Sequence, residues 1–155
     1  MNGYSLKKFF ASPFSVKALP YLLLVFAALG FLDAAYLTIQ HYQHAIPPCT
    51  VGGCETVLTS QFATVFGVPI ALLGAGFYAA VLLATGLFLQ THKKQLVTIL
   101  FLLCTAGFLV GLALIGIQAF ILHSWCYYCL FSELIDFLLF DTSWWLYNSK
   151  NYPNF

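Results

Sequence analysis

Four of the five cysteines stand in two close pairs, and such pairs can carry out disulfide chemistry. Cys49 and Cys54 are separated by four residues, and Cys126 and Cys129 form a Cys-x-x-Cys motif. If a helix begins at the second pair, its two thiols lie one turn apart, and the backbone N–H groups of the first turn favour a thiolate. Disulfides exchange by thiolate attack through mixed disulfides, so two adjacent pairs can pass on two electrons. The spacing therefore predicts a thiol–disulfide relay if the fold brings the pairs together.

The composition indicates the kind of protein that holds these cysteines. Of the 155 residues, 61% are apolar and only 7% are charged, and the mean hydropathy is +0.89. Because soluble domains carry about 25% charged residues, this composition excludes a soluble enzyme, a disordered chain and a secreted disulfide-rich miniprotein. A net charge of +1 and the absence of arginine also exclude a nucleic-acid-binding protein. The sequence predicts a small integral membrane protein.

Four hydrophobic segments are long enough to cross a bilayer. A bilayer core about 30 Å thick needs roughly 20 mostly apolar residues in a helix, and lipid offers no water to unpaired backbone groups, so open strands are not expected. The fourth segment is the weakest because it contains Glu133, Asp136 and Asp141. We predict an all-α fold, a bundle of four transmembrane helices in a single membrane domain over residues 1–155. The predicted helices cover residues 19–41, 69–89, 96–122 and 126–147.

The lysines predict the orientation of these helices. All six lie near the chain ends or between the second and third segments, and the other two connections contain none. Since an even number of spans puts these places on one side, the positive-inside bias assigns both termini to the cytoplasm. The long loop over residues 42–68 is then exoplasmic. The six residues are Lys7, Lys8, Lys17, Lys93, Lys94 and Lys150.

The same topology sorts the cysteines. Both pairs fall on the exoplasmic side, which is oxidising. Cys104 lies alone in the third segment, 18 residues before Leu122, which is about 27 Å along a helix. We therefore predict that Cys104 is a buried, packed thiol that does not take part in the relay.

Other interpretations of the four exoplasmic cysteines remain open. A static disulfide between Cys49 and Cys54 would tie down the loop, although a purely structural bridge at Cys126 and Cys129 is less usual than a redox-active one. All four thiolates could also bind zinc tetrahedrally in a membrane protein that is not an enzyme. Such sites favour reducing compartments, which argues against zinc here.

Further motifs, taken together with the cysteines, resemble the vitamin K epoxide reductase family. The resemblance runs from about residue 36 to residue 133 and lies in the combination of a cysteine pair in the first exoplasmic loop, a serine after it, a Gly-x-Pro before the second helix and the Cys-x-x-Cys before the fourth. The matching residues are Cys49, Cys54-Glu-Thr-Val-Leu-Thr-Ser60, Phe66-Gly-Val-Pro69, Gly74, Tyr78 and Trp125-Cys-Tyr-Tyr-Cys-Leu130.

The resemblance implies a role for each of these residues. A four-helix bundle would surround a quinone near the exoplasmic face, and Cys126 and Cys129 would reduce it, with Cys129 nearer the ring. Cys54 would exchange with Cys126, and Cys49 would meet an outside protein. Ser60 matches a loop serine implicated in activity, and Tyr78 would lie at the quinone.

Two departures from the family pattern refine this expectation. At the positions where vertebrate members hydrogen-bond the quinone with an Asn and a Tyr, this chain has Ile70 and Glu133. This favours plain quinone reduction (menaquinone, ubiquinone or a vitamin K-like quinone) over reduction of vitamin K epoxide itself.

Many prokaryotic members carry a fused thioredoxin-like domain, but this chain stops at Phe155, so the resemblance implies a separate thioredoxin-fold thiol oxidase outside the cytoplasm. The short spacing from Cys49 to Cys54 favours a prokaryotic plasma (inner) membrane.

Acidic residues within the membrane predict polar contacts inside the bundle. Glu133 and Asp136 follow Cys129 by four and seven residues and so share its helical face. Glu133 could hydrogen-bond the quinone or deliver a proton to it, or either carboxyl could be satisfied by a neighbouring helix. Asp33 is expected to be a helix-packing partner.

The predicted function is a membrane thiol–quinone oxidoreductase that supports disulfide bond formation. The unrelated family of disulfide bond formation protein B places its Cys-x-x-Cys in the first exoplasmic loop, whereas this chain has it in the second. The remaining alternatives are the structural four-thiolate zinc site and vitamin K epoxide reduction proper.

Overall fold

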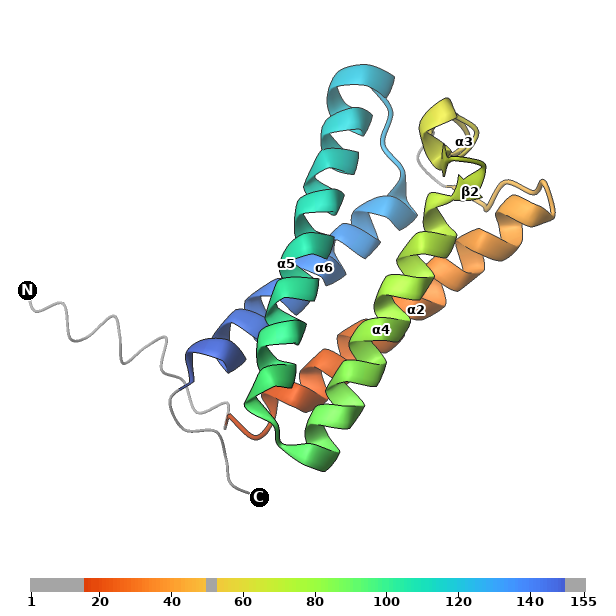
Figure 1. Cartoon of the computed structure of the whole chain (residues 1–155). Helices are drawn as coiled ribbons and strands as arrows, with labels where there is room; N and C mark the ends of the chain where they lie inside the picture. Colours follow the sequence, from red (N-terminus) through yellow and green to blue (C-terminus); the bar gives the residue numbers. More distant parts are fainter. Residues whose placement is uncertain (1–15, 50–52, 150–155) are drawn as a thin grey trace, which may run out of the picture.

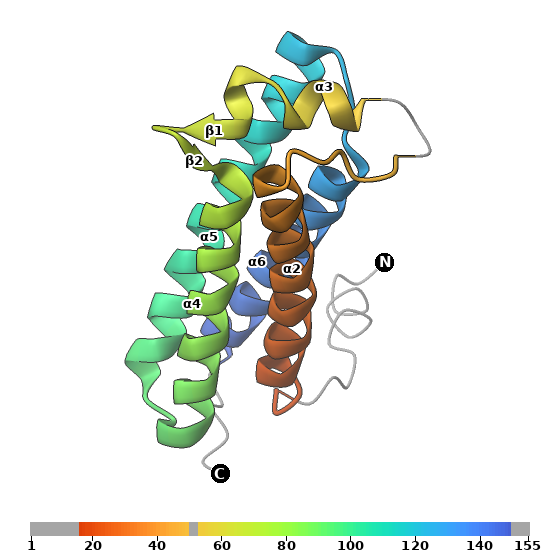
Figure 2. The same cartoon turned by 90° about the vertical axis from the view of Figure 1, so that its right-hand side faces the viewer.

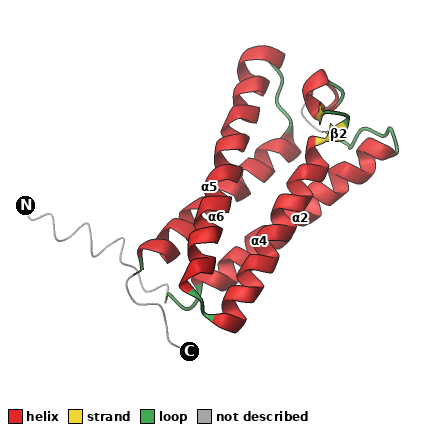
Figure 3. Cartoon of the chain, in the orientation of Figure 1, coloured by secondary structure: helices red, strands yellow, loops and turns green. Residues whose placement is uncertain are grey.

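A computed structural model describes residues 16–49 and 53–149, and this part of the chain is almost entirely helical (Figure 3). Four long helices make up its body: α2 (Leu19–Tyr42), α4 (Ile70–Thr91), α5 (Lys94–Ile117) and α6 (Tyr127–Asn148). The shorter elements are α3 (Cys54–Leu58), the 3-10 helix η1 (Gln61–Ala63), the strands β1 (Thr64–Val65) and β2 (Val68–Pro69), and the π-helical turn η2 (Gln118–Leu122).

The long helices form a bundle in which α2 packs against α4 and α6, while α5 packs against α6 and α4 (Figures 1 and 2). On α2 the buried residues recur every three or four positions, which is the spacing of one helical face. Gly30 on that face lies against the ring of Tyr78 from α4, where a β-carbon would collide with the ring. The buried residues of α2 are Pro20, Leu23, Ala27, Gly30, Ala34 and Leu37.

The outer surface of the bundle is suited to lipid. Large apolar side chains point outward on several helices, among them Leu83 and Leu102, which are 69% and 61% exposed. Three of the helical stretches are long and apolar enough to cross a membrane, namely α2, α4 and α5 together with η2. The chain is therefore a membrane protein. Helix α6 is not among the three, although it has the same length as α4 and packs against both α5 and α2.

The two ends of the bundle carry different residues. At the lysine end lie the start of α2 with Lys17 and the tight α4–α5 turn, where His92 adopts a left-handed conformation before Lys93 and Lys94 (Figure 1). At the opposite end, here called the cysteine end, lie α3, the β1–β2 hairpin, η2 and the start of α6. The other three lysines, Lys7, Lys8 and Lys150, fall outside the described residues.

The structure differs in detail from the predicted segments. The 42–68 loop contains α3, η1 and a small antiparallel hairpin that pairs Val65 with Val68. Its two turn residues, Phe66 and Gly67, both have positive φ, which is the geometry of a tight hairpin turn. The predicted third helix keeps α-helical geometry only to Ile117, since η2 completes it with π-helical turns. These short features depend on local backbone conformations that hydropathy does not encode.

Candidate active site

The first cysteine pair forms a disulfide at the cysteine end. Cys49 ends the described stretch after α2, and Cys54 is the first residue of α3. The Cα atoms of the pair are 6.2 Å apart, within the usual range for a disulfide. Cys54 is fully buried and Cys49 is partly exposed. Of the two sulfur atoms, that of Cys49 is therefore the one open to an outside thiol.

The second pair sits at the start of α6 with both thiols free. Cys126 is the N-cap residue, with an extended backbone, and its sulfur accepts a hydrogen bond from the backbone N–H of Cys129 at 3.4 Å. This is the position at which Ser, Thr, Asp or Asn usually caps a helix. Cys126 is fully buried, whereas Cys129 is partly exposed.

The surroundings of Cys126 favour its thiolate. The side-chain hydrogen bond from Cys129 lowers the pKa of Cys126 to about 7, and backbone N–H groups of Cys129 and Tyr128 act in the same direction, while burial opposes them. A thiol with a pKa near 7 is both a competent nucleophile and a good leaving group. The hydrogen bonds at the start of α6 therefore favour a thiolate at Cys126.

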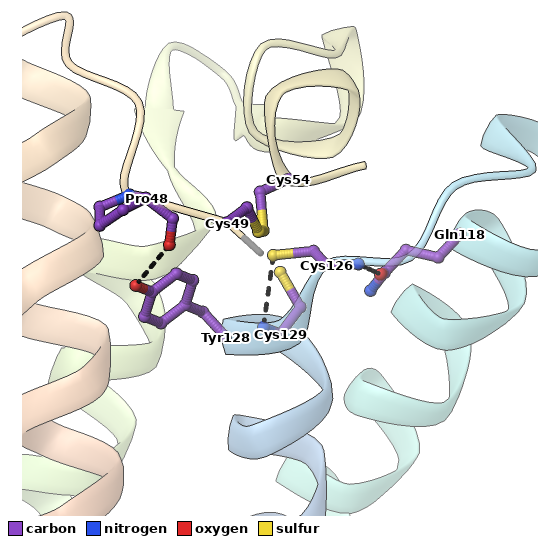
Figure 4. Close-up of a disulfide and its surroundings, with 7 residues drawn as sticks. All are labelled: Pro48, Cys49, Cys54, Gln118, Cys126, Tyr128 and Cys129. Atoms are coloured by element: carbon purple, nitrogen blue, oxygen red, sulfur yellow. Dashed lines mark hydrogen bonds between the residues drawn. A yellow bond between two sulfur atoms is a disulfide. The ribbon is translucent and has the colours of Figure 1, made fainter. Parts of the chain in front are cut away.

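The two pairs come together where Gly53, just before Cys54, lies directly against the backbone of Trp125, just before Cys126. Gly53 has φ of 142°, and a β-carbon there would collide with the carbonyl group of Trp125. Figure 4 shows the disulfide of Cys49 and Cys54 beside the sulfur of Cys126, with Cys129 below it. This is the arrangement that a thiol–disulfide relay requires.

Two further residues form hydrogen bonds to the backbone at or next to the two cysteine pairs, and sequence reasoning missed both. The hydroxyl of Tyr128 donates a hydrogen bond to the carbonyl of Pro48 at 3.2 Å (Figure 4). The ring of Tyr128 also contacts that of Tyr36. The side chain of Gln118 accepts a hydrogen bond from the backbone N–H of Cys126 at 3.0 Å. The position of Tyr128 inside the Cys-x-x-Cys motif could have suggested a role, but Gln118 is eight residues away in an apolar segment.

Two other residues of the predicted site, Ser60 and Ile70, belong to segments at the cysteine end of the bundle. Ser60 follows α3 and is half-buried, and its hydroxyl donates to the carbonyl of Val57 at 2.8 Å. Ile70 is the first residue of α4 and is also half-buried. The Ser60 hydroxyl thus pairs with a backbone carbonyl in the last turn of α3. Ile70 lies at the cysteine end of the bundle.

A polar cluster lies inside the bundle, below Cys129 along α6. The hydroxyl of Ser132 donates to a carboxylate oxygen of Asp33 at 2.6 Å, which links α6 to α2 as expected for a packing partner. Tyr78, only 2% exposed, donates its hydroxyl to the backbone carbonyl of Ser132 at 3.2 Å. In the described part of the chain, one buried oxygen each of Glu133 and Asp136 has no hydrogen-bond partner.

The carboxyl group of Glu133 occupies a notch in α5. A β-carbon at Gly111 would overlap the Glu133 carboxyl group, so the side chain reaches across to α5 only because residue 111 is a glycine. Cys104, which precedes Gly111 on α5, is fully buried and has a free thiol. It stands apart from both pairs, as the sequence predicted.

The disulfide argues against the alternative of a four-thiolate zinc site. Two of the four thiols that would have to bind zinc are joined to each other in the structure. Among residues 16–49 and 53–149, no group of three or more His, Cys, Asp or Glu side chains lies close enough to hold a metal ion.

Comparison with known proteins adds to this geometry. The model of the vitamin K epoxide reductase family matches residues 21–144, which include both cysteine pairs and the polar cluster. The chain belongs to the vitamin K epoxide reductase family. A relative in Arabidopsis thaliana, named thiol-disulfide oxidoreductase LTO1, is 32% identical over 124 residues. That match covers 72% of this chain and 32% of the relative, so the chain corresponds to about a third of the relative's length.

Proposed function

We propose that this member of the vitamin K epoxide reductase family is a membrane thiol–quinone oxidoreductase. It would take two electrons from a dithiol protein through Cys49 and Cys54, pass them to Cys126 and Cys129, and deliver them to a quinone. The observation that carries the proposal is the placement of the Cys49–Cys54 disulfide beside the sulfur of the buried Cys126, whose pKa is lowered (Figure 4). Thiol chemistry is also supported by the family membership and by the relative in Arabidopsis thaliana, which is named a thiol-disulfide oxidoreductase.

The first step takes place at Cys49. A thiolate of the donor protein attacks the exposed sulfur of Cys49, forms a mixed disulfide and releases Cys54 as a thiolate. The second thiol of the donor then resolves the mixed disulfide, so that the donor leaves oxidised and the first pair is left as a dithiol. The burial of Cys54 directs the attack to Cys49.

The second step transfers the electrons between the pairs. The thiolate of Cys54 attacks Cys126 in an oxidised Cys126–Cys129 bridge and releases Cys129. Cys49 then attacks Cys54, which re-forms the first disulfide and releases Cys126. Because a thiol of lower pKa leaves faster, the acidity of Cys126 promotes this last release.

The third step requires an electron acceptor that dissolves in lipid. A quinone accepts two electrons and two protons to become a hydroquinone while the dithiol of Cys126 and Cys129 returns to a disulfide. The site fits such a ring in part, since Cys129 is partly exposed and Glu133 presents a buried oxygen without a hydrogen-bond partner in the described structure. We assign Glu133 to a hydrogen bond with the ring or to proton delivery, and Ile70 and Tyr78 to its apolar surroundings.

The position in the membrane follows from the same proposal. Helix α6 would be the fourth span, which puts both cysteine pairs on the exoplasmic side of a plasma membrane and the lysine end in the cytoplasm. The donor would be a thioredoxin-fold thiol oxidase on the exoplasmic side. Ser60 would act through the shape of the loop that carries Cys54.

Quinone reduction by the purified protein with a dithiol donor tests the proposal. The Cys129→Ala variant should lose turnover, whereas Cys104→Ala should keep it because that thiol lies apart from both pairs. In a Cys49→Ala variant, a bridge between Cys54 and Cys126 should accumulate and be detectable by mass spectrometry of the alkylated protein. Full turnover in Cys129→Ala would refute the relay.

A further inference from the structure

The chain returns from α5 to α6 through a short segment that is held by one residue. The backbone carbonyl of Gln118 accepts the N–H of His123 and, at 3.2 Å, that of Ser124. Its side-chain carbonyl accepts the N–H of Cys126 at 3.0 Å. Three backbone N–H groups of the returning segment thus donate hydrogen bonds to Gln118, which is 4% exposed. Figure 4 shows the one from Cys126.

The backbone at this point is unusual in two ways. Gln118 begins the π-helical turn η2, and His123 ends that turn in a left-handed conformation with φ of 47°. π-Helical turns within longer helices occur frequently at functional sites, and a left-handed conformation is uncommon for residues other than glycine. Both features bring the returning chain back toward the side chain of Gln118.

The hydrogen bond to Gln118 also decides where the sulfur of Cys126 points. An N-cap residue must keep an extended backbone for its side chain to reach the first-turn amides. Cys126 has φ of −105° and ψ of 118°, and its sulfur accepts the N–H of Cys129. With its own N–H fixed by Gln118, Cys126 cannot turn into the helix, and its sulfur stays beside the disulfide of the first pair.

We infer that Gln118 is a positioning residue for the thiol relay, which holds Cys126 within reach of Cys54. The inference rests on the function proposed above but concerns only the exchange between the cysteines. Gln118 is buried and makes its side-chain hydrogen bond to the backbone of Cys126 rather than to a sulfur atom. Gln118 acts on the reaction through the backbone of Cys126.

The effective concentration of Cys126 relative to Cys54 measures this positioning directly. A full-length chain with Cys49→Ser and Cys129→Ser retains only Cys54, Cys126 and the isolated Cys104. Equilibration with reduced and oxidised dithiothreitol, approached from both directions, gives the equilibrium constant for the Cys54–Cys126 bridge. Adding Gln118→Met, which keeps the chain length but removes the acceptor, should lower this constant about tenfold, the effect of one buried hydrogen bond.

Two controls separate positioning from general damage. In the chain with all native cysteines, Gln118→Met should leave the equilibrium constant of the Cys49–Cys54 bridge unchanged, because Gln118 holds the other pair. Phe120→Ala alters a side chain in the same turn that is 80% exposed, and it should leave both constants unchanged. If Gln118→Met does not fold, Gln118→Asn carries the same prediction, since its acceptor is one methylene too short to reach Cys126.

The outcomes are distinct. A Cys54–Cys126 constant that stays within twofold of the reference, or an equal fall for both bridges, would overturn the role of Gln118. A failure of the proposed function would show separately, as the absence of quinone reduction by the unaltered chain, and would leave this equilibrium measurement intact.

Discussion

Gly53 packs directly against the backbone of Trp125, with no room between them for a side chain. These two residues immediately precede Cys54 and Cys126, so their contact sets how closely one cysteine pair approaches the other. The approach is possible because Gly53 lacks a β-carbon and tolerates φ of 142°. The proposed relay would therefore depend on a residue whose side chain takes no part in the reaction.

Replacing Gly53 with alanine should separate the two pairs. The new β-carbon would meet the carbonyl of Trp125, and the backbone conformation would become strained by about 1–3 kcal/mol. In a Cys49→Ala background we expect the yield of the Cys54–Cys126 bridge to fall at least severalfold. Gly86→Ala in α4, where a β-carbon would meet no neighbour, is the matched control. An unchanged yield in Gly53→Ala would show that the pairs meet in another way.

The reactivity of Cys126 should depend on pH with a midpoint near 7. Its lowered pKa means that the thiolate is populated above about pH 7 and is lost as the pH falls through that value. The ultraviolet absorbance of the thiolate, followed during titration of a chain in which only Cys126 and Cys129 remain, gives this midpoint. Cys129→Ala removes the side-chain hydrogen-bond donor that contributes most to the lowered pKa, and it should raise the midpoint toward that of an ordinary thiol. An unchanged midpoint in that variant would contradict the assignment.

The Gly111 notch should control where Glu133 lies. Gly111→Ala would place a β-carbon where the Glu133 carboxyl group now packs, and overpacking of this kind costs about 1–3 kcal/mol of folding free energy. We expect a lower melting temperature in detergent and a higher KM for quinone. Adding Glu133→Ala should restore the stability but not the KM. Gly116→Ala on the same helix, where space is open, should change neither quantity. A stability loss that Glu133→Ala does not relieve would show that the notch serves another neighbour.

Tyr78→Phe separates a structural from a quinone-binding role of the hydroxyl group. Because that hydroxyl already donates to the carbonyl of Ser132, its removal should lower the free energy of unfolding by about 1 kcal/mol. The KM for quinone should stay unchanged, since the ring of Tyr78 remains in place against Gly30. Steady-state kinetics and thermal unfolding of the same preparation make the comparison. A raised KM with unchanged stability would place the hydroxyl on the quinone instead.

The long helices and the presence of both cysteine pairs at one end of the bundle could be predicted from the sequence, because hydropathy over about 20 residues and the spacing of a Cys-x-x-Cys motif are properties of contiguous residues. The hydrogen bond of Gln118 to Cys126 could not be predicted from the sequence. Its partner, Cys126, comes close only because the chain reverses through a π-helical turn, and such a turn has no sequence signature that we could use. Likewise, the Gly111 notch depends on which face of α5 meets Glu133, and that is set by the packing of the whole bundle.

Cys54 and Cys126 are buried, whereas Cys49 is partly exposed. This difference separates the two buried cysteines from small molecules in the surrounding water. In the proposed relay, a small thiol in the surrounding water would have access to Cys49 but not to the buried Cys54, so it would form a mixed disulfide without supplying the second thiol that completes the reduction. A donor protein that binds beside Cys49 supplies both thiols at once and would therefore be favoured over small thiols.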